Sequence, residues 1–302
     1  MTGARHFGIL LRAGLFVVFI HYFGALIASL LYEAAGYFPA AALSFFLAAT
    51  IASAFAVRTF ERGRLEDIGM NWTRDSSRHL LLGAAAGAAA ALLVTVVPAA
   101  AGLASFEPAP GWAYQPGRLL FTSVLLLFGV VGEEMMFRGY AFQILLRHYK
   151  PWIVIPGFAV LFALAHAGNP GVSRLGLLNT ALWGFLLGFA FFRSHDLWLP
   201  IGLHFGWNWI LPLAGVSLSG FEMSLLGYRL VWRASEVWSG GAYGPEASIL
   251  TSVAALALAG WLCRVRLNRQ PAPLVEALDE RPANSPGFRP AGSGGAGADR
   301  QG

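Results

Sequence analysis

Charged residues are scarce in this sequence of 302 residues. Only 12% of the residues are charged, 56% are hydrophobic, and the mean hydropathy is +0.58. A soluble domain is roughly one quarter charged, so this composition predicts a polytopic membrane protein. Cysteine occurs once, at Cys263, which excludes an internal disulfide framework and a cysteine-based metal cluster.

Eight apolar segments approach the ~20 residues that a helix needs to cross a bilayer. They cover about residues 13–31, 39–57, 80–103, 119–146, 152–167, 175–192, 198–216 and 247–263. The predicted fold is therefore all-α, with about eight transmembrane helices in one membrane domain of residues 1–269. Residues 270–302 are rich in Pro, Gly, Ala and Ser, and this composition predicts a disordered tail.

Arginine and lysine are distributed unevenly over the connections between these segments. If the N-terminus is cytoplasmic, the cytoplasmic side holds Arg5, Arg12, Arg58, Arg62, Arg64, Arg74, Arg78, Arg147, Lys150, Arg193, Arg264, Arg266 and Arg269. The opposite side then holds only Arg118, Arg174, Arg229 and Arg233. Because positively charged connections stay in the cytoplasm, both termini are predicted to be cytoplasmic. These flanking residues account for the net charge of +5, so the expected partner is the lipid bilayer and not a nucleic acid.

Two adjacent acids, Glu133 and Glu134, lie inside an otherwise apolar segment. An ionisable side chain near the centre of a membrane costs at least about 2.5–3.5 kcal/mol on insertion scales, and it marks a candidate functional site. Arg138 follows Glu134 at the i, i+4 spacing of an ion pair along one helix. We expect this pair to have a structural, supporting role.

Two later apolar segments carry polar residues that can join these acids. One contains His166, and the other contains His204 and Asn208 one helical turn apart. A buried glutamate beside a histidine can activate a water molecule. An imidazole and a carboxamide on one helix face can stabilise an oxyanion. Together these residues predict a hydrolytic site.

Each of these residues also has a simpler interpretation. A single His or Asn in a membrane helix more often bonds to a neighbouring helix than takes part in catalysis, so the prediction depends on their joint occurrence. His21 is isolated in the first segment and His195 lies next to Asp196 in a turn, so no role is expected for either of them. Two glycine pairs with the small-xxx-small spacing predict close helix packing. They are Gly83 with Gly87 and Gly184 with Gly188.

Three motifs follow one another along the chain: Glu133-Glu134-x-x-x-Arg138, Phe162-x-x-x-His166 and His204-x-x-x-Asn208. In this order they resemble the CPBP family of intramembrane proteases, also called the CAAX protease and bacteriocin-processing or Abi family. The resemblance covers about residues 119–210, with softer similarity at residues 67–70 and 239–246. All three motifs are intact.

The resemblance implies an eight-helix membrane fold around a hydrated cavity, and an intramembrane peptidase that depends on a glutamate. Carried over by position, Glu133 with His166 would activate the water. His204 and Asn208 would hold the oxyanion. The remaining motif residues, Glu134 and Arg138, would support them.

Zinc is the open question about cofactors, because zinc dependence has been argued both ways for this family. Glu133, His166 and His204 can complete a zinc site with one open position. The sequence lacks the His-Glu-x-x-His spacing that places two ligands on one helical turn. We therefore expect no cofactor, with zinc as the alternative.

The substrate implied by the resemblance is a peptide or protein. The eukaryotic branch of the family removes a C-terminal tripeptide after a prenylated cysteine. This chain is rich in arginine and has a single lysine, Lys150, a bias typical of GC-rich bacteria, which generally lack prenylated proteins. We expect a membrane-embedded or lipid-anchored peptide at a bacterial cell membrane. Two other functions stay open: a transporter or proton relay that uses the same polar cluster, and a non-catalytic scaffold.

Overall fold

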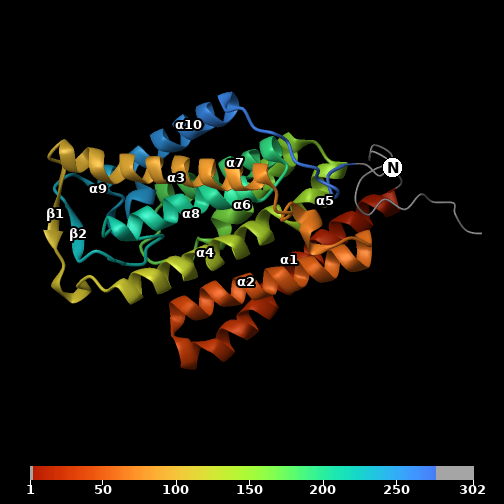
Figure 1. Cartoon of the computed structure of the whole chain (residues 1–302), viewed down its shortest axis with the longest axis horizontal. Coiled ribbons are helices and arrows are strands. Elements are labelled where there is room, and N and C mark those ends of the chain that lie inside the picture. Colours follow the sequence, from red (N-terminus) through yellow and green to blue (C-terminus); the bar gives the residue numbers. More distant parts are fainter. Residues whose placement is uncertain (1–2, 277–302) are drawn as a thin grey trace, which may run out of the picture.

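The computed structural model describes residues 3–276 of the chain, which form a bundle of helices with one small sheet (Figure 1). The α-helices are α1 (Gly3–Ala35), α2 (Tyr37–Ala56), α3 (Arg74–Ala100), α4 (Pro116–Arg138), α5 (Tyr140–His148), α6 (Pro151–Ala165), α7 (Arg174–Ser194), α8 (Trp198–Leu213), α9 (Glu236–Ser239) and α10 (Ile249–Arg264). The strands are β1 (Ala104–Pro108) and β2 (Tyr228–Trp232). Short helical turns are η1 (Val57–Glu61), η2 (Leu65–Ile68), η3 (Pro110–Trp112), η4 (Gly241–Tyr243) and η5 (Pro245–Ala247).

Five helical segments of the described chain are long and apolar enough to cross a membrane, judged by length and composition. They are Gly3–Ala35, Tyr37–Glu61, Arg74–Ala100, Pro116–His148 and Arg174–Ser194. Helices α6 and α10 are apolar but shorter, and α8 has 16 residues. Each predicted segment overlaps a helix, and the chain is an integral membrane protein with several apolar helices.

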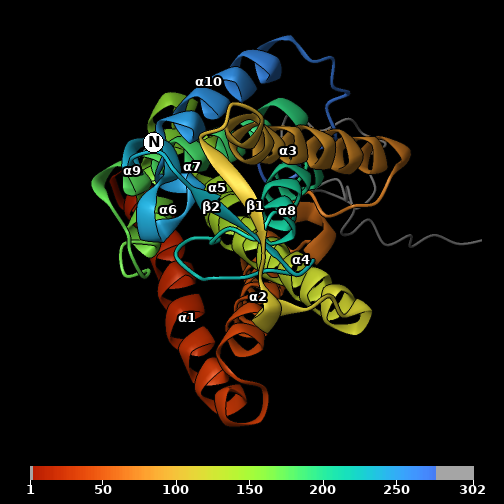
Figure 2. The ribbon, with the colours of Figure 1, turned by 90° about the vertical axis from the view of Figure 1, so that its left-hand side faces the viewer.

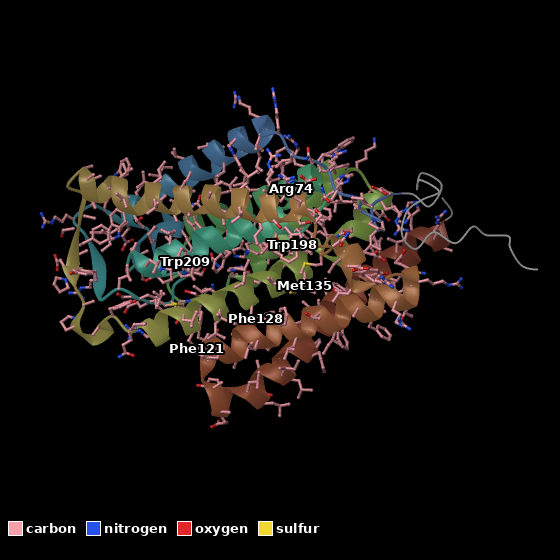
Figure 3. The ribbon with its side chains drawn as sticks, viewed as in Figure 1. Arg74, Phe121, Phe128, Met135, Trp198 and Trp209 are labelled. Carbon is pink, nitrogen blue, oxygen red and sulfur yellow. The ribbon has the colours of Figure 1, made fainter. Side chains whose placement is uncertain are left out.

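The helices run between two ends of the molecule. The strand end consists of residues 36, 101–115, 166–173 and 214–248, and it includes β1 and β2 (Figure 1). The α5 end consists of residues 57–73, 139–150, 195–197 and 265–276, and α5 and the amino-terminal start of α1 lie there. Figure 3 shows α8 running from Trp198 to Trp209, opposite in direction to α4 from Phe121 to Met135.

The two strands correct the all-α prediction. β1 pairs antiparallel with β2, and Phe106 lies opposite Leu230. Each strand has five residues, and the two belong to connections that are far apart in the sequence. Their pairing depends on how these connections pack over the helix ends, so no local periodicity indicates it.

Helices α3 and α8 pack closely because glycines face each other between them. A Cβ atom at Gly83 or Gly87 would collide with backbone atoms of α8, and one at Gly206 would collide with the carbonyl oxygen of Ala84. The packing role predicted for Gly83 and Gly87 is confirmed. Gly184 makes a similar approach to α6, where an added Cβ would lie 2.9 Å from the Cα of Ala159.

Helices α1 and α2 form a hairpin that projects from one side of the bundle (Figure 2). Within this hairpin, α2 packs closely against α4. A Cβ atom at Gly132 of α4 would lie 2.6 Å from the backbone nitrogen of Phe46 of α2. The first half of α2 is thereby placed beside the polar cluster of α4.

Residues 270–276, which the sequence placed in the tail, pack against the α5 end. Leu274 is buried, and its carbonyl oxygen accepts a hydrogen bond of 2.7 Å from Nε of Arg147. The backbone nitrogen of Gln270 donates to the carbonyl oxygen of Ser194 at 2.9 Å. The remainder of the predicted disordered tail, residues 277–302, lies outside the described residues.

Candidate active site

The paired acids lie near the carboxyl end of α4, where the helix breaks. Gly139 separates α4 from α5, and a Cβ atom there would collide with the carbonyl oxygen of Met135. The segment predicted at residues 119–146 covers both helices, which together make up the apolar helical segment Pro116–His148. The last turns of α4 place Glu134 and Arg138 inside the bundle, where both are fully buried, while Glu133 faces the cavity with 28% of its side chain exposed.

Glu134 forms a buried network with partners from two helices. Its Oε1 accepts from Nη1 of Arg138 at 3.2 Å and lies 2.8 Å from Nδ1 of His204 on α8. Arg138 also donates to the carbonyl oxygen of Gly184 at 2.8 Å, and its guanidinium lies 4.8 Å from the ring centre of Phe162. The network thus connects α4 to α6, α7 and α8.

Glu133 lies on the other side of the same imidazole. Its Oε2 is 3.9 Å from Nε2 of His204. Within residues 3–276 this oxygen is buried and has no hydrogen-bond partner. If Glu133, Glu134 and Arg138 are all ionised, the four-residue cluster is electrically neutral when His204 carries a proton. Two carboxylates and one guanidinium therefore surround a histidine that faces the cavity.

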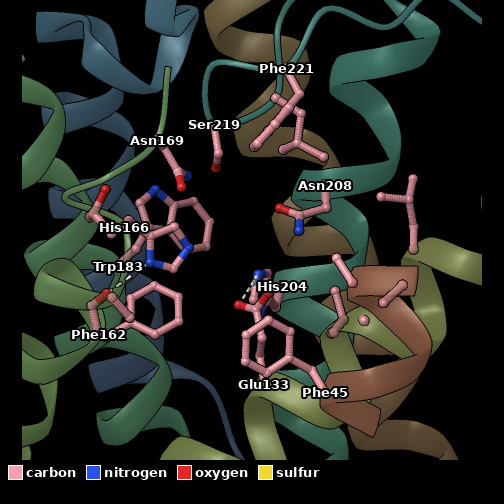
Figure 4. A pocket seen from close by; sticks show the side chains of 18 of the residues that line it. Phe45, Glu133, Phe162, His166, Asn169, Trp183, His204, Asn208, Ser219 and Phe221 are labelled. Carbon is pink, nitrogen blue, oxygen red and sulfur yellow. Dashed lines mark hydrogen bonds and ion pairs between the residues drawn. The ribbon is translucent and has the colours of Figure 1, made fainter. Parts of the chain in front are cut away.

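The cluster opens into a cavity of about 480 Å³ (Figure 4). Figure 4 shows Glu133, His204 and Asn208 along one wall and His166 with Trp183 along another. His166 ends α6, and its Nδ1 must donate to the carbonyl oxygen of Phe162 at 2.8 Å, because that oxygen can only accept. This bond leaves Nε2 of His166 as the nitrogen that can act in the cavity.

The structure brings all six predicted residues together at the polar cluster and the cavity beside it. The imidazole beside Glu133 belongs to His204, whereas His166 faces the cluster from the other wall. Asn208 lines the cavity one turn beyond His204. His21, for which no role was expected, also lines the cavity. His195 follows the carboxyl end of α7 and is not among the lining residues.

A further acid, Glu246, reaches this cavity, and sequence reasoning assigned it no role. It lies in η5, just before α10. Its carboxylate accepts from Nε1 of Trp207 at 3.3 Å and from the backbone nitrogen of Ser219. Burial raises the pKa of Glu246, and the hydrogen bonds from Ser219 and Trp207 oppose that shift. The only signal in the sequence was the softer similarity at residues 239–246.

The described residues are not arranged as a zinc centre. Within residues 3–276, no group of three or more His, Cys, Asp or Glu side chains is placed to hold a metal ion. The bonds of Nδ1 of His204 to Glu134 and of Nδ1 of His166 to Phe162 fix the orientation of both rings and leave Nε2 of each ring for other partners.

Comparison with known proteins gives one family. Residues 115–210 match the family model described as Type II CAAX prenyl endopeptidase Rce1-like. The matched range contains α4 to α8 up to Ile210, and so all six residues of the site. A search of curated proteins found no match.

Proposed function

Because residues 115–210 form a domain of the Rce1-like family of type II CAAX prenyl endopeptidases, which are intramembrane peptidases, we propose that this chain hydrolyses a peptide bond of a membrane-associated peptide or protein. Water is the nucleophile, and Glu133 is the base. The reaction takes place in the cavity between α2, α4, α6, α7 and α8.

In the proposed reaction, Glu133 takes a proton from a water held between it and Nε2 of His166. The water oxygen attacks the carbonyl carbon of the substrate, and the carbonyl oxygen becomes an oxyanion. Asn208 and His204 donate hydrogen bonds to this oxyanion. When the oxyanion collapses, the bond between carbon and nitrogen breaks, and the proton held by Glu133 passes to the leaving amine.

Glu134 and Arg138 act indirectly in this proposal. The bond from Nδ1 of His204 to Glu134 leaves Nε2 facing the cavity and Glu133. Nε2 can donate only when the imidazole is protonated, and the neutral charge of the cluster supports that state. Arg138 holds Glu134 in place.

The observation that carries the proposal is the position of Glu133. Its side chain lines the cavity, is 28% exposed, and lies 3.9 Å from Nε2 of His204. A general base needs a carboxylate within reach of water and of the substrate.

The test compares membranes of cells that produce the wild-type protein, Glu133→Gln or the control Glu33→Gln, whose site is exposed on α1. We expect peptide termini that are present with wild type and Glu33→Gln and absent with Glu133→Gln, because an amide keeps the volume but cannot accept the proton. Loss of a general base costs about 10²–10⁴-fold in rate. The same termini in the Glu133→Gln membranes would refute the proposal, as would a transporter-like proton flux that depends on Glu133 without any cleavage.

A further inference from the structure

The catalytic cavity is built from one end of the molecule. The residues that line it outside the α-helices are His166, Asn169, Leu218, Ser219, Phe221, Met223 and Glu246, and all of them belong to the strand end. Helix α2 contributes lining residues only from its first half, Tyr37 to Phe45, which is the half nearest the strand end. No lining residue belongs to the α5 end.

The residues of the α5 end pack tightly against the end of α4 that carries the polar cluster. Tyr140 and Phe142 of α5 are fully buried. Gln143 is also buried, and its side-chain nitrogen donates to the carbonyl oxygens of Ile68 at 2.7 Å and Arg138 at 2.8 Å. These bonds join α5, the turn η2 and the end of α4, so the described chain closes the site on this side.

Positive charge is concentrated at the closed end. Arg5 and Arg12 lie in the first part of α1, Arg74 begins α3, and Arg264 ends α10. Arg12 lies 3.8 Å from Glu61, which places the start of α1 beside η1 at the α5 end. The full set of thirteen basic residues given above falls at or next to this end, against four at or next to the strand end. Such an asymmetry orients the basic connections toward the cytoplasm.

We propose that the catalytic cavity opens to the non-cytoplasmic side of the membrane, so that the peptide it cuts is an extracytoplasmic segment of a membrane-anchored or exported protein. The cut itself rests on the proposed function, whereas the direction of opening does not. The cytoplasmic end is basic and packed, and the opposite end supplies every connection that borders the cavity.

The substrate class follows from the direction and the lining. Phe45 on α2 and Phe221 in the strand end face the cavity together with the polar cluster (Figure 4). Apolar side chains beside Glu133 and at the strand end favour a segment that leaves the bilayer there, with apolar side chains beside the bond that is cut. A peptide confined to the cytoplasm has no path to Glu133 through the packed residues of the α5 end.

The direction can be tested by labelling cysteines from each side, without any activity. The background is Cys263→Ser, which removes the only native thiol. Three single-cysteine variants are then made: Asn169→Cys at the strand end, Asn208→Cys beside the cluster, and Arg74→Cys, exposed at the basic end. A charged, membrane-impermeant maleimide is applied to right-side-out and to inside-out vesicles.

We expect Asn169→Cys and Asn208→Cys to be labelled in right-side-out vesicles only, and Arg74→Cys in inside-out vesicles only. Labelling in SDS shows that each thiol is intact. Labelling of Asn208→Cys from the same side as Arg74→Cys would overturn the proposal, and so would an Asn208 thiol that is labelled from neither side while Asn169→Cys reacts. A chain that labels as expected but cuts nothing would refute the peptidase function alone.

Discussion

Nδ1 of His204 lies 2.8 Å from Oε1 of Glu134, the same oxygen that accepts from Arg138. One carboxylate oxygen therefore holds both the arginine of its own helix and the histidine of α8. The second oxygen of Glu134 is buried and has no hydrogen-bond partner among residues 3–276. Glu134 thus links α4 to α8, and each of its two interactions can be removed on its own by mutation.

The first prediction concerns the buried pair. Arg138→Met leaves the Glu134 carboxylate without its guanidinium, and removal of one partner of a buried ion pair costs about 3–5 kcal/mol. Combining Arg138→Met with Glu134→Gln should cost less than the sum of the single changes, with a coupling of at least about 0.5 kcal/mol. The double variant should not recover wild-type stability, because His204 has also lost its carboxylate.

Thermal unfolding in detergent measures this cycle. The matched control is the surface pair Arg64 and Glu66, whose side chains are 82% and 48% exposed. The same substitutions there should show coupling close to zero, since exposed ion pairs contribute only about 0–1 kcal/mol. Simple additivity at Glu134 and Arg138 would contradict the structural role of the pair.

The second prediction is that Glu246 positions the part of α8 that carries His204 and Asn208. Its bond to Trp207 fixes the residue between His204 and Asn208 on α8, and its bond to Ser219 fixes the strand end beside the cavity. Hydrogen bonds to charged groups contribute about 1.5–3 kcal/mol. If that energy holds the catalytic geometry, Glu246→Gln should lower kcat by about tenfold or more, since 1.36 kcal/mol corresponds to a factor of ten.

Steady-state kinetics of reconstituted protein separates this role from a purely structural one. Glu222→Gln is the control, because Glu222 is exposed in the same connection, and its kcat should stay at the wild-type value. A lower melting temperature of Glu246→Gln with unchanged kcat and KM would show that Glu246 stabilises the fold without positioning the site.

Local pattern was enough to predict most of the helices and which polar side chains gather around the cavity. Apolar length indicated the spans, and the spacing of Glu134 to Arg138 and of His204 to Asn208 predicted which side chains share a helix face. Contacts between helices were not accessible in this way. That His204 lies between both glutamates depends on how closely α8 approaches α4, and the sequence alone does not specify that distance.

The strands and Glu246 escaped prediction for a related reason. β1 and β2 pair with each other across two distant connections, and five residues are too few for a clear periodicity. Glu246 precedes an apolar helix in a connection rich in glycine, where a single acid ordinarily indicates a solvated turn. Its burial arises from the fold of residues 214–248 over the helix ends.

The third prediction concerns the contact of α3 with α8. Gly206→Ala should destabilise the protein strongly, because the new methyl group would collide with the carbonyl oxygen of Ala84. Overpacking in a well-packed interior typically costs about 1–3 kcal/mol.

Gly157→Ala in α6 is the control, since an added Cβ there has no atom within 4 Å. That change should be neutral or slightly stabilising, because alanine favours the helix by about 1 kcal/mol over glycine. Equal melting temperatures for the two variants would contradict the close helix approach.

The last prediction separates two mechanisms that use the same residues. If Glu133 activates water directly, exhaustive chelation followed by removal of the chelator should leave activity unchanged, and the purified protein should contain far less than one zinc per chain. A bound zinc ion would instead lower the pKa of its water to about 7, so chelation would abolish activity and stoichiometric zinc would restore it. We expect the first outcome, because no group of three or more His, Cys, Asp or Glu side chains within residues 3–276 is placed to hold a metal ion. Metal content by mass spectrometry must accompany the activity, since adventitious zinc between Glu133 and His204 can inhibit and imitate a metal effect. Zinc that is required for turnover and is lost in His166→Ala or His204→Ala would make these histidines ligands, and the assignment of His204 as a donor to the oxyanion would be wrong.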